Sequence, residues 1–336
     1  MNEMGNYMEN AVEILFTEKI LKFFLESFRL ESEIKKLGDF ENYVFEVYRE
    51  EQPYILRITH SSHRSADEIL AELDWMNYLY DQNVNCPTAF KSTKNQLIEV
   101  LPAGDGSLFY ACLFSKVNGY PVKINSTEFN DQLFTAWGKA IGQMHSVTKN
   151  YQPSERLKLR PSWEEEELLN IEAYVPNEME IINNTKLLIS ELKSLPRSKE
   201  NFGLIHSDIH SGNFFYDGES VHVFDFDDCS YHWYASDIAI PLYYSIFYGY
   251  QSASVGEREQ FAIKFLTQFI EGYEKYNELP EGWKEQLPLF FKLRDITLYA
   301  VLHKKILPEG RDENLNQMLE ALKWRIINKE PIVRLG

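Results

Sequence analysis

The spacing of apolar side chains changes along the chain, and the change falls near Gly119. Before it, the segment 31–114 reads mainly as strands. Tyr43–Glu50 alternates apolar and polar side chains, a polar turn follows at Glu51 and Gln52, and Pro53–His60 begins a second apolar run. Two alternating runs joined by a short polar turn predict a β-hairpin. Further strand-like runs occupy 88–93, 95–102 and 107–115.

Helical spacing is found once in this first part and throughout the second. The segment Ala66–Tyr80 predicts a helix, because five apolar residues recur every three or four positions and so share one face: Ile69, Leu70, Leu73, Met76 and Tyr80. The same spacing runs from Phe129 to Met144 and returns near 179–194, 257–274, 283–303 and 313–327.

One segment interrupts the helical part. Phe202–Tyr231 holds short apolar strands, polar turns and three glycines. This composition predicts a site carried on loops and supported by a helical scaffold.

Composition narrows the class of protein. A chain of 336 residues exceeds one typical domain, and 44% hydrophobic with 14% aromatic residues favours a folded enzyme of two lobes over a disordered chain. The net charge of −17 opposes binding to nucleic acid or an anionic membrane. It would attract a cationic substrate, although an acidic surface also serves solubility, and both interpretations stay open.

Cysteine content and the terminal segments indicate the compartment. The chain has three cysteines, an odd number without metal-finger spacing, so a disulfide framework is not expected. The amino terminus lacks a cationic stretch leading into an apolar core, and no apolar run is long enough to span a bilayer. The sequence therefore predicts a cytoplasmic protein without a membrane partner.

The candidate chemistry lies in LIHSDIHSGNFF, Leu204–Phe215, and in VFDFDD, Val223–Asp228. Transfer of a phosphoryl group needs a residue that orients the acceptor hydroxyl and accepts its proton, and oxygen ligands for magnesium. Asp208, Asn213 and Asp225 supply these groups.

The pattern HxDxxxxN, followed by an apolar strand that ends in Asp, resembles the aminoglycoside phosphotransferase and choline kinase superfamily. The resemblance implies an α+β, protein-kinase-like fold with two lobes. Residues 1–116 would form a small antiparallel-sheet lobe that binds nucleotide and ends in the hinge, and residues 117–336 a larger, mainly helical lobe with the catalytic loop and acceptor site. ATP would bind between the lobes, together with Mg²⁺.

The resemblance also assigns roles in the catalytic loop. Asp208 would be the catalytic carboxylate, and Asn213 and Asp225 the magnesium ligands. His206 would be a structural loop residue, and Asp237 a buried carboxylate that braces the loop.

In the first lobe the resemblance implies a nucleotide site. The loop that covers the phosphates would lie within Leu37–Val47, but Gly38 is its one glycine, so a plain β-turn is an equal alternative. Arg57 would stand where protein kinases have lysine, since its fork can bind phosphate oxygens. Glu72 would be its partner, with Glu68 in reserve, and a solvated surface pair is the competing interpretation.

The hinge and the acceptor site are the least determined parts. Ser115 and Val117 lie in the hinge segment, where backbone groups would bind adenine. Asp227 and Asp228 would face the acceptor or serve turn chemistry. Tyr231 could line an acceptor site with the neighbouring aromatic residues Trp233 and Tyr234, or all three could be core. The acidic run Glu164–Glu167 is interpreted as a solvated helix face, and attraction of a cationic acceptor is the alternative.

The sequence predicts an ATP- and Mg²⁺-dependent phosphotransferase that acts on a hydroxyl of a small metabolite, which could be cationic. Three alternatives stand beside it. One is a protein serine/threonine kinase of the same superfamily, and another is a catalytically weak, kinase-like binding module. The third, a metallophosphoesterase, would use Asp208 and His210 as metal ligands but lacks the downstream motifs of that class. The acceptor, the preference for ATP over GTP and the oligomeric state are not predicted.

Overall fold

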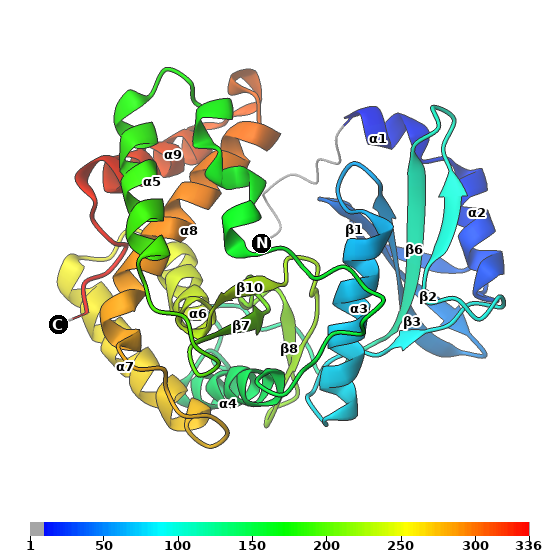
Figure 1. Ribbon diagram of the computed structural model, residues 1–336, viewed down its shortest axis with the longest axis horizontal. Helices are drawn as coiled ribbons and strands as arrows, with labels where there is room; N and C mark the ends of the chain where they lie inside the picture. Colours follow the sequence, from blue (N-terminus) through cyan, green and yellow to red (C-terminus); the bar gives the residue numbers. More distant parts are fainter. Residues whose placement is uncertain (1–9, 336) are drawn as a thin grey trace. The chain divides into compact units, whose positions relative to one another are not determined.

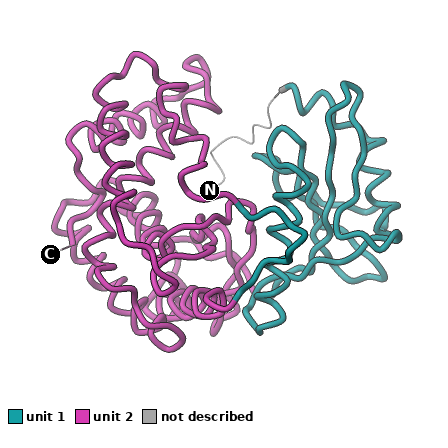
Figure 2. The backbone as a smooth tube through the Cα atoms, in the orientation of Figure 1, with its two compact units in different colours: residues 1–118, 151–160 teal, residues 119–150, 161–336 magenta. Residues whose placement is uncertain are grey.

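The computed structural model describes residues 10–335, which form two compact units (Figure 2). The first unit holds the described residues up to Asn118 together with Tyr151–Arg160, and the second holds Gly119–Asn150 and the described residues from Pro161 onward. The functional assignment of 1–116 and 117–336 stays a prediction. Within the described range, no helix is long and apolar enough to cross a bilayer.

The first unit is built on an antiparallel sheet (Figure 1). The order of strands is β1-β2-β3-β6-β4, and β5 also pairs with β6. The strands are β1 (Ile34–Gly38), β2 (Asn42–Arg49), β3 (Gln52–His60), β4 (Ala89–Phe90), β5 (Glu99–Pro102) and β6 (Leu108–Ser115).

The predicted hairpin is β2–β3, but its turn lies one residue earlier than expected. Arg49 pairs with Gln52, so the two turn residues are Glu50 and Glu51. Both have positive φ, +53° and +62°, as a two-residue primed turn requires. This turn matches the twist of the strands, which explains why Gln52 belongs to β3 and not to the turn.

Helices cover both faces of the sheet. On one face, Ile20 and Phe24 of α2 (Glu18–Ser27) belong to a buried cluster with Leu56 and Ile58 of β3. Side chains alternate along a strand, so Arg57 points to the other face, where it meets Glu72 of α3 (Ala66–Asp81). Neither α2 nor the short α1 (Asn10–Leu15) was predicted from the sequence.

Helix α3 agrees with the predicted segment, with one difference. Ser65 and Glu68 form a capping box that fixes its start. Ile69, Leu73 and Met76 are buried, but Tyr80 is 46% exposed and does not share their face in the core. Tyr80 lies in the last turn of the helix, where the unit no longer covers it.

The second unit is mainly helical. Its helices are α4 (Asp131–Thr148), α5 (Met179–Lys193), α6 (Tyr234–Gly249), α7 (Val255–Tyr273), α8 (Trp283–Lys305), α9 (Glu313–Asn328) and the short η1 (Trp163–Glu165), η2 (Glu167–Leu169), η3 (Ile171–Ala173) and η4 (Pro308–Gly310). Two strand pairs interrupt them, β7 (Phe202–Ile205) with β10 (Ser230–Trp233) and β8 (Phe214–Tyr216) with β9 (Val221–Val223). Both pairs lie in the segment that was predicted to carry the site.

Candidate active site

A buried carboxylate on α6 holds the backbone that precedes Asp208. Asp237 lies in the first turn of α6 and is fully buried. It accepts hydrogen bonds from the backbone N–H groups of His206, at 3.0 Å, and Ser207, at 2.9 Å. Ser207 has φ +68°, a conformation that costs about 1–3 kcal/mol for a residue with a side chain. The two charge-assisted hydrogen bonds offset this cost and aim Asp208.

Two histidines complete this support. The Nδ1 atom of His206 accepts the N–H of Asp208 at 3.3 Å, so its proton lies on Nε2, 3.0 Å from the carbonyl oxygen of Phe224. His145 of α4 places Nε2 3.3 Å from Asp237, and burial lowers the pKa of His145. The loop is therefore fixed by two fully buried imidazoles.

The β8–β9 hairpin brings Asn213 and Asp225 together. Asn213 directly precedes β8, Asp225 follows β9, and the N–H of Phe224 donates to the carbonyl of Asn213 at 2.9 Å. The Asn213 Nδ2 atom donates to the carbonyl oxygen and to Oδ2 of Asp208, at 2.9 and 3.0 Å. Its amide oxygen therefore points away from Asp208.

These groups suit a hard divalent cation. Asp225 is exposed and has φ +67°, which turns its carboxylate out of the strand direction. A carboxylate and an amide oxygen carried by neighbouring strand ends are the ligand types that magnesium and calcium prefer. The residues present fit such an ion.

The Asp208 carboxylate lies among cationic and hydrogen-bonding groups. Its Oδ1 atom pairs with Nη2 of Arg294 on α8, and its Oδ2 atom lies 3.4 Å from Nε2 of His210. Burial raises the pKa of Asp208, but the Arg294 guanidinium and His210 outweigh burial and bring the pKa to about 2. The side chain remains 17% exposed, so an ionised carboxylate is open to a ligand.

In the first unit, Arg57 and Glu72 form a buried pair. Arg57 Nη1 and Nη2 donate to Glu72 Oε1 and Oε2 at 2.8 and 2.6 Å. Both residues are at most 5% exposed. The reserve candidate Glu68 is engaged by Ser65 in the capping box, which leaves Glu72 as the partner and excludes the interpretation as a solvated surface pair.

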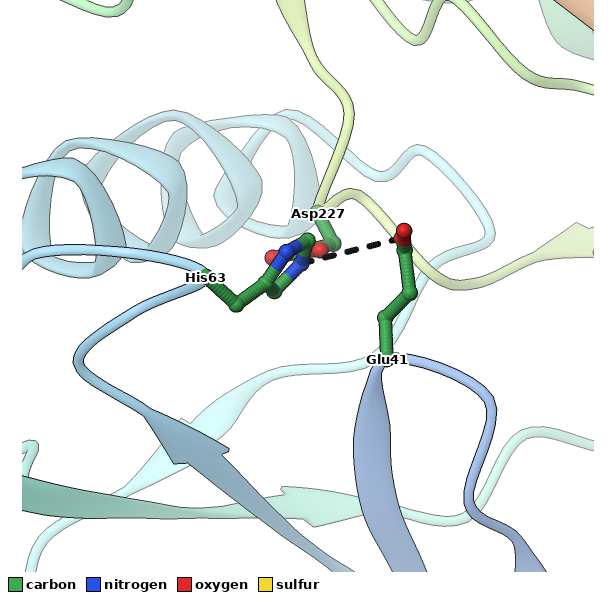
Figure 3. Close-up of side chains that lie close together, drawn as sticks. All are labelled: Glu41, His63 and Asp227. Atoms are coloured by element: carbon green, nitrogen blue, oxygen red, sulfur yellow. Dashed lines mark ion pairs between the residues drawn. The ribbon is translucent and has the colours of Figure 1, made fainter. Parts of the chain in front are cut away.

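The turn around Gly38 is acidic. Gly38 ends β1 at a register shift, and a Cβ placed on it would meet no neighbour within 4 Å. Lys36 pairs with Asp39, and His63 places Nε2 3.8 Å from Glu41 Oε2, the ion pair drawn in Figure 3. Neither close packing within the protein nor a positive φ demands glycine at position 38, and the role of this loop over the phosphates stays a prediction.

The hinge candidates lie at the end of β6. Ser115 pairs with Tyr54, and its N–H donates to the carbonyl of Thr88 at 3.0 Å. The Ser115 hydroxyl accepts the N–H of Thr88 in return. Val117 follows in the loop and is half-buried.

The acceptor candidates separate into different environments. Asp227 is 5% exposed, whereas Asp228 is exposed. Tyr231 lies on β10 opposite Leu204 and is half-buried, which raises the pKa of its hydroxyl. Its two aromatic neighbours on the chain, Trp233 and Tyr234, are at most 1% exposed and belong to the core.

The acidic run at 164–167 is part of the short helices η1 and η2 and not of one longer helix. Glu164 pairs with Lys193 and Arg197, and Glu167 pairs with Lys304 at 2.9 Å. The charges of Glu164 and Glu167 are therefore matched within the second unit.

The three histidines that follow His210 in the sequence contact residues other than Asp208. His222 pairs with Asp217 at 2.7 Å in the β8–β9 turn, and His232 packs between Trp163 and Phe290. The Nδ1 atom of His303 is 2.9 Å from the carbonyl of Tyr299 in its own helix. They do not gather with Asp208 and His210, as a two-metal phosphoesterase would require.

Sequence reasoning missed Arg294 and Tyr244. Arg294 Nε donates to the Tyr244 hydroxyl at 2.9 Å, and Tyr248 stacks on Tyr244. The signal was present, because Arg294 and Asp295 are adjacent opposite charges in the helical stretch 287–302, whose other residues are mostly apolar. A charged residue in such a stretch requires a buried partner.

Comparison with known proteins agrees with this geometry. The phosphotransferase enzyme family matches residues 33–282. Amicoumacin kinase of Bacillus subtilis (strain 168) is 35% identical over 301 residues, which cover 89% of this chain and 88% of the relative.

Solved structures show the same fold. The amicoumacin kinase hAmiN, in complex with AMP-PNP, Ca²⁺ and Ami, superposes with a TM-score of 0.91 at 33% identity over 98% of both chains. A microcompartment-associated aminopropanol kinase superposes with a TM-score of 0.75 at 20% identity, over 95% of this chain and 100% of that one. The fold is thus the protein-kinase-like α+β fold that the sequence predicted, and a metallophosphoesterase is excluded. The chain belongs to the phosphotransferase enzyme family and is a kinase of small molecules.

Proposed function

We propose that the protein transfers the γ-phosphoryl group of ATP to a hydroxyl of a small molecule in a magnesium-dependent reaction. The observation that carries this proposal is the Asp208 carboxylate, which Arg294 and the Asn213 amide nitrogen hold next to the hairpin that carries Asn213 and Asp225. The complex of hAmiN with AMP-PNP and Ca²⁺ supports the choice of nucleotide and of a divalent cation.

The residues of the second unit perform the acceptor half of the reaction. Asp208 accepts a hydrogen bond from the acceptor hydroxyl, orients the oxygen towards the phosphoryl group and takes up the proton as the new bond forms. A carboxylate with a pKa of about 2 is a weak base, so orientation is its larger contribution, as a loose transition state allows. Asn213 and Asp225 would hold the cation, which supplies neutralisation of the phosphate charge when bound.

The first unit would serve the nucleotide. The bidentate contact with Glu72 fixes the Arg57 guanidinium, so a phosphate would meet a group that needs no further ordering. Ser115 and Val117 would contribute backbone groups to the adenine. In this proposal residues 1–116 form the nucleotide lobe and residues 117–336 the lobe for the acceptor.

The acceptor that the relatives favour is amicoumacin. Two of the proteins most similar to this chain are amicoumacin kinases, at 35% and 33% identity over nearly their whole length. Asp228 and Tyr231 would line the acceptor site, whereas Asp227 is buried. The similarity to these two kinases also favours a small-molecule acceptor over a protein side chain.

A turnover screen tests the proposal. Wild type and Asp208→Ala are incubated with Mg-ATP and, in turn, amicoumacin, amino alcohols, aminoglycosides and homoserine, and ADP release and product mass are measured. Phosphorylation of one compound by the wild type, with loss of at least about 10²-fold in Asp208→Ala, is expected. Failure of Mg-ATP to bind or of every compound to react would overturn the proposal.

A further inference from the structure

Arg294 and Tyr244 form a contact chain that ends at the Asp208 carboxylate. The Arg294 Nε atom donates to the Tyr244 hydroxyl at 2.9 Å, and the guanidinium carbon lies 4.9 Å from the centre of the Tyr244 ring. The Nη2 atom of the same guanidinium pairs with Asp208 Oδ1. Tyr244 is 6% exposed, so the core fixes the position of the aromatic ring that Arg294 contacts.

The other carboxylate oxygen is held by the loop itself. The N–H of Gly212 donates to His210 Nδ1 at 2.9 Å, so Nδ1 is the acceptor and Nε2 carries the ring proton. That nitrogen is 3.4 Å from Asp208 Oδ2, which also accepts from Asn213. The His210 ring touches Tyr244, with 4.9 Å between ring centres. Tyr244 therefore supports groups on both sides of the carboxylate.

The arrangement leaves a defined place for the acceptor hydroxyl. An ionised carboxylate offers about four lone-pair directions. Asn213 and His210 lie against Oδ2 and Arg294 against Oδ1, so the remaining direction belongs to Oδ1, the oxygen that Arg294 holds. The position of Arg294 consequently sets the angle at which the hydroxyl can bind.

We propose that Arg294, set by Tyr244, is a positioning residue for phosphoryl transfer that fixes the Asp208 carboxylate plane. The inference rests on the proposed function and deepens it. A group that aligns the base with the reacting oxygen acts on kcat, because a misplacement of 1 Å can cost about 10²-fold in rate. It should leave nucleotide binding unchanged, because its contacts are to Asp208 and Tyr244.

The next residue on α8 shows what a purely structural pair looks like. Asp295 accepts hydrogen bonds from Arg325 Nε and Nη2 and from the Tyr243 hydroxyl, at 2.9, 2.6 and 2.7 Å. Its side chain is 1% exposed. The side chains of Arg294 and Asp208 are 22% and 17% exposed. Two adjacent residues of α8 thus form different ion pairs. Asp295 pairs with Arg325 in the core, whereas Arg294 pairs with Asp208 where a ligand can reach the carboxylate.

The test compares Arg294→Gln, Arg294→Lys and Tyr244→Phe with the wild type, using the compound that the screen identifies. Arg294→Gln should lower kcat by about 10²-fold with the KM for Mg-ATP unchanged. Arg294→Lys keeps the charge but loses the fork and should lower kcat by about 10-fold. Tyr244→Phe removes the oxygen that accepts from Nε and should have a smaller effect. Ethylguanidine should restore activity to Arg294→Ala.

Controls separate the possible failures. Arg334→Gln removes an exposed arginine from its pair with Glu330 and should match the wild type. Melting temperature and Mg-ATP binding are measured for each variant, and Arg294→Lys and Tyr244→Phe decide the matter if Arg294→Gln does not fold. An inactive wild type would contradict the proposed function. An active wild type whose Arg294 variants keep kcat within about threefold, or change only the acceptor KM, would overturn this inference alone.

Discussion

Two arginine–carboxylate pairs, Arg57–Glu72 in the sheet unit and Arg294–Asp208 in the helical unit, join the same groups in different surroundings. In the first pair, the side chains are 6% and 1% exposed and the guanidinium fork meets both carboxylate oxygens. In the second, the side chains are 22% and 17% exposed, and the carboxylate is shared with Asn213 and His210.

The difference shows that the carboxylate orients the arginine in the first pair, whereas the arginine orients the carboxylate in the second. Glu72 has both oxygens committed to Arg57, so it can only hold that side chain in place. Asp208 has its oxygens divided among partners from different elements and keeps an exposed edge. The buried pair thus fixes the guanidinium that we propose for the phosphates, whereas the divided and open pair leaves an edge of the carboxylate for the acceptor.

The largest effect is expected from breaking the buried pair. Arg57→Met leaves the Glu72 carboxylate buried without its partner and should lower the free energy of unfolding by about 3–5 kcal/mol. Denaturant unfolding followed by circular dichroism measures it. The double variant Arg57→Met/Glu72→Leu should regain most of the loss. If Arg57→Met is as stable as the wild type, the Glu72 carboxylate is not held in a buried pair.

A smaller effect is expected at the open site. Asn213→Ala removes both the amide oxygen proposed as a metal ligand and the donor to Asp208. The magnesium concentration for half-maximal turnover should rise by about 10–100-fold. Asn213→Asp restores an oxygen ligand and should need less magnesium than Asn213→Ala. Equal magnesium requirements in wild type and Asn213→Ala would remove Asn213 from the metal site.

The buried histidines of the helical unit are a third kind of environment, in which burial disfavours the charged imidazole. The pH dependence of stability tests this. Burial lowers the pKa of His232 to about 3 from its ordinary value of 6.5, and it lowers the pKa of His145 in the same direction. As pH falls below about 6.5 the unfolded chain takes up protons that the folded protein does not, so stability falls by up to about 1.4 kcal/mol per pH unit and group.

The free energy of unfolding is unaffected by these histidines above about pH 6.5, and it falls as the pH is lowered from 6.5 towards 3. The lowered pKa of Asp208 adds its own loss only below about pH 4, and the difference between wild type and His232→Gln between pH 4.5 and 6.5 isolates the contribution of His232. His232→Gln should flatten the slope in that window. An unchanged slope would mean that His232 is protonated in the folded protein.

The smallest effect is expected from exposed pairs. Lys22→Gln removes the partner of Glu26, and both side chains are at least 70% exposed. Water and salt screen such a pair, and holding two long side chains costs entropy. No measurable change in melting temperature is expected. A clear drop would show that exposure alone does not separate the pairs of this protein.

The comparison also explains what the sequence could predict. Arg57 and Glu72 are 15 residues apart on a strand and the helix that follows it, and Asp208 and Asn213 lie within one loop. Residues that lie this close in the sequence can be predicted to meet from the local order of strand, helix and loop. Arg294 is 86 residues from Asp208, and only the packing of α6 against α8 brings them together.

Tertiary packing likewise decides the parts of the fold that the pattern did not foresee. Helix α2 owes its place to a buried cluster with strands later in the chain, and Tyr151–Arg160 joins the first unit through contacts such as that of Tyr151 with Asp74. The run at 164–167 folds into short 3₁₀ turns held by distant lysines and an arginine. Neither charge nor periodicity within these segments contains that information.

The most direct test measures Arg57→Lys and Arg294→Lys side by side, by Mg-ATP affinity and by the single-turnover rate of phosphoryl transfer to the identified acceptor. We expect Arg57→Lys to weaken Mg-ATP binding, because a lysine cannot replace the fork held by Glu72. We expect Arg294→Lys to bind Mg-ATP as the wild type does but to transfer the phosphoryl group about 10-fold more slowly. The same defect in both variants, or the two defects exchanged, would contradict the division of roles between the pairs.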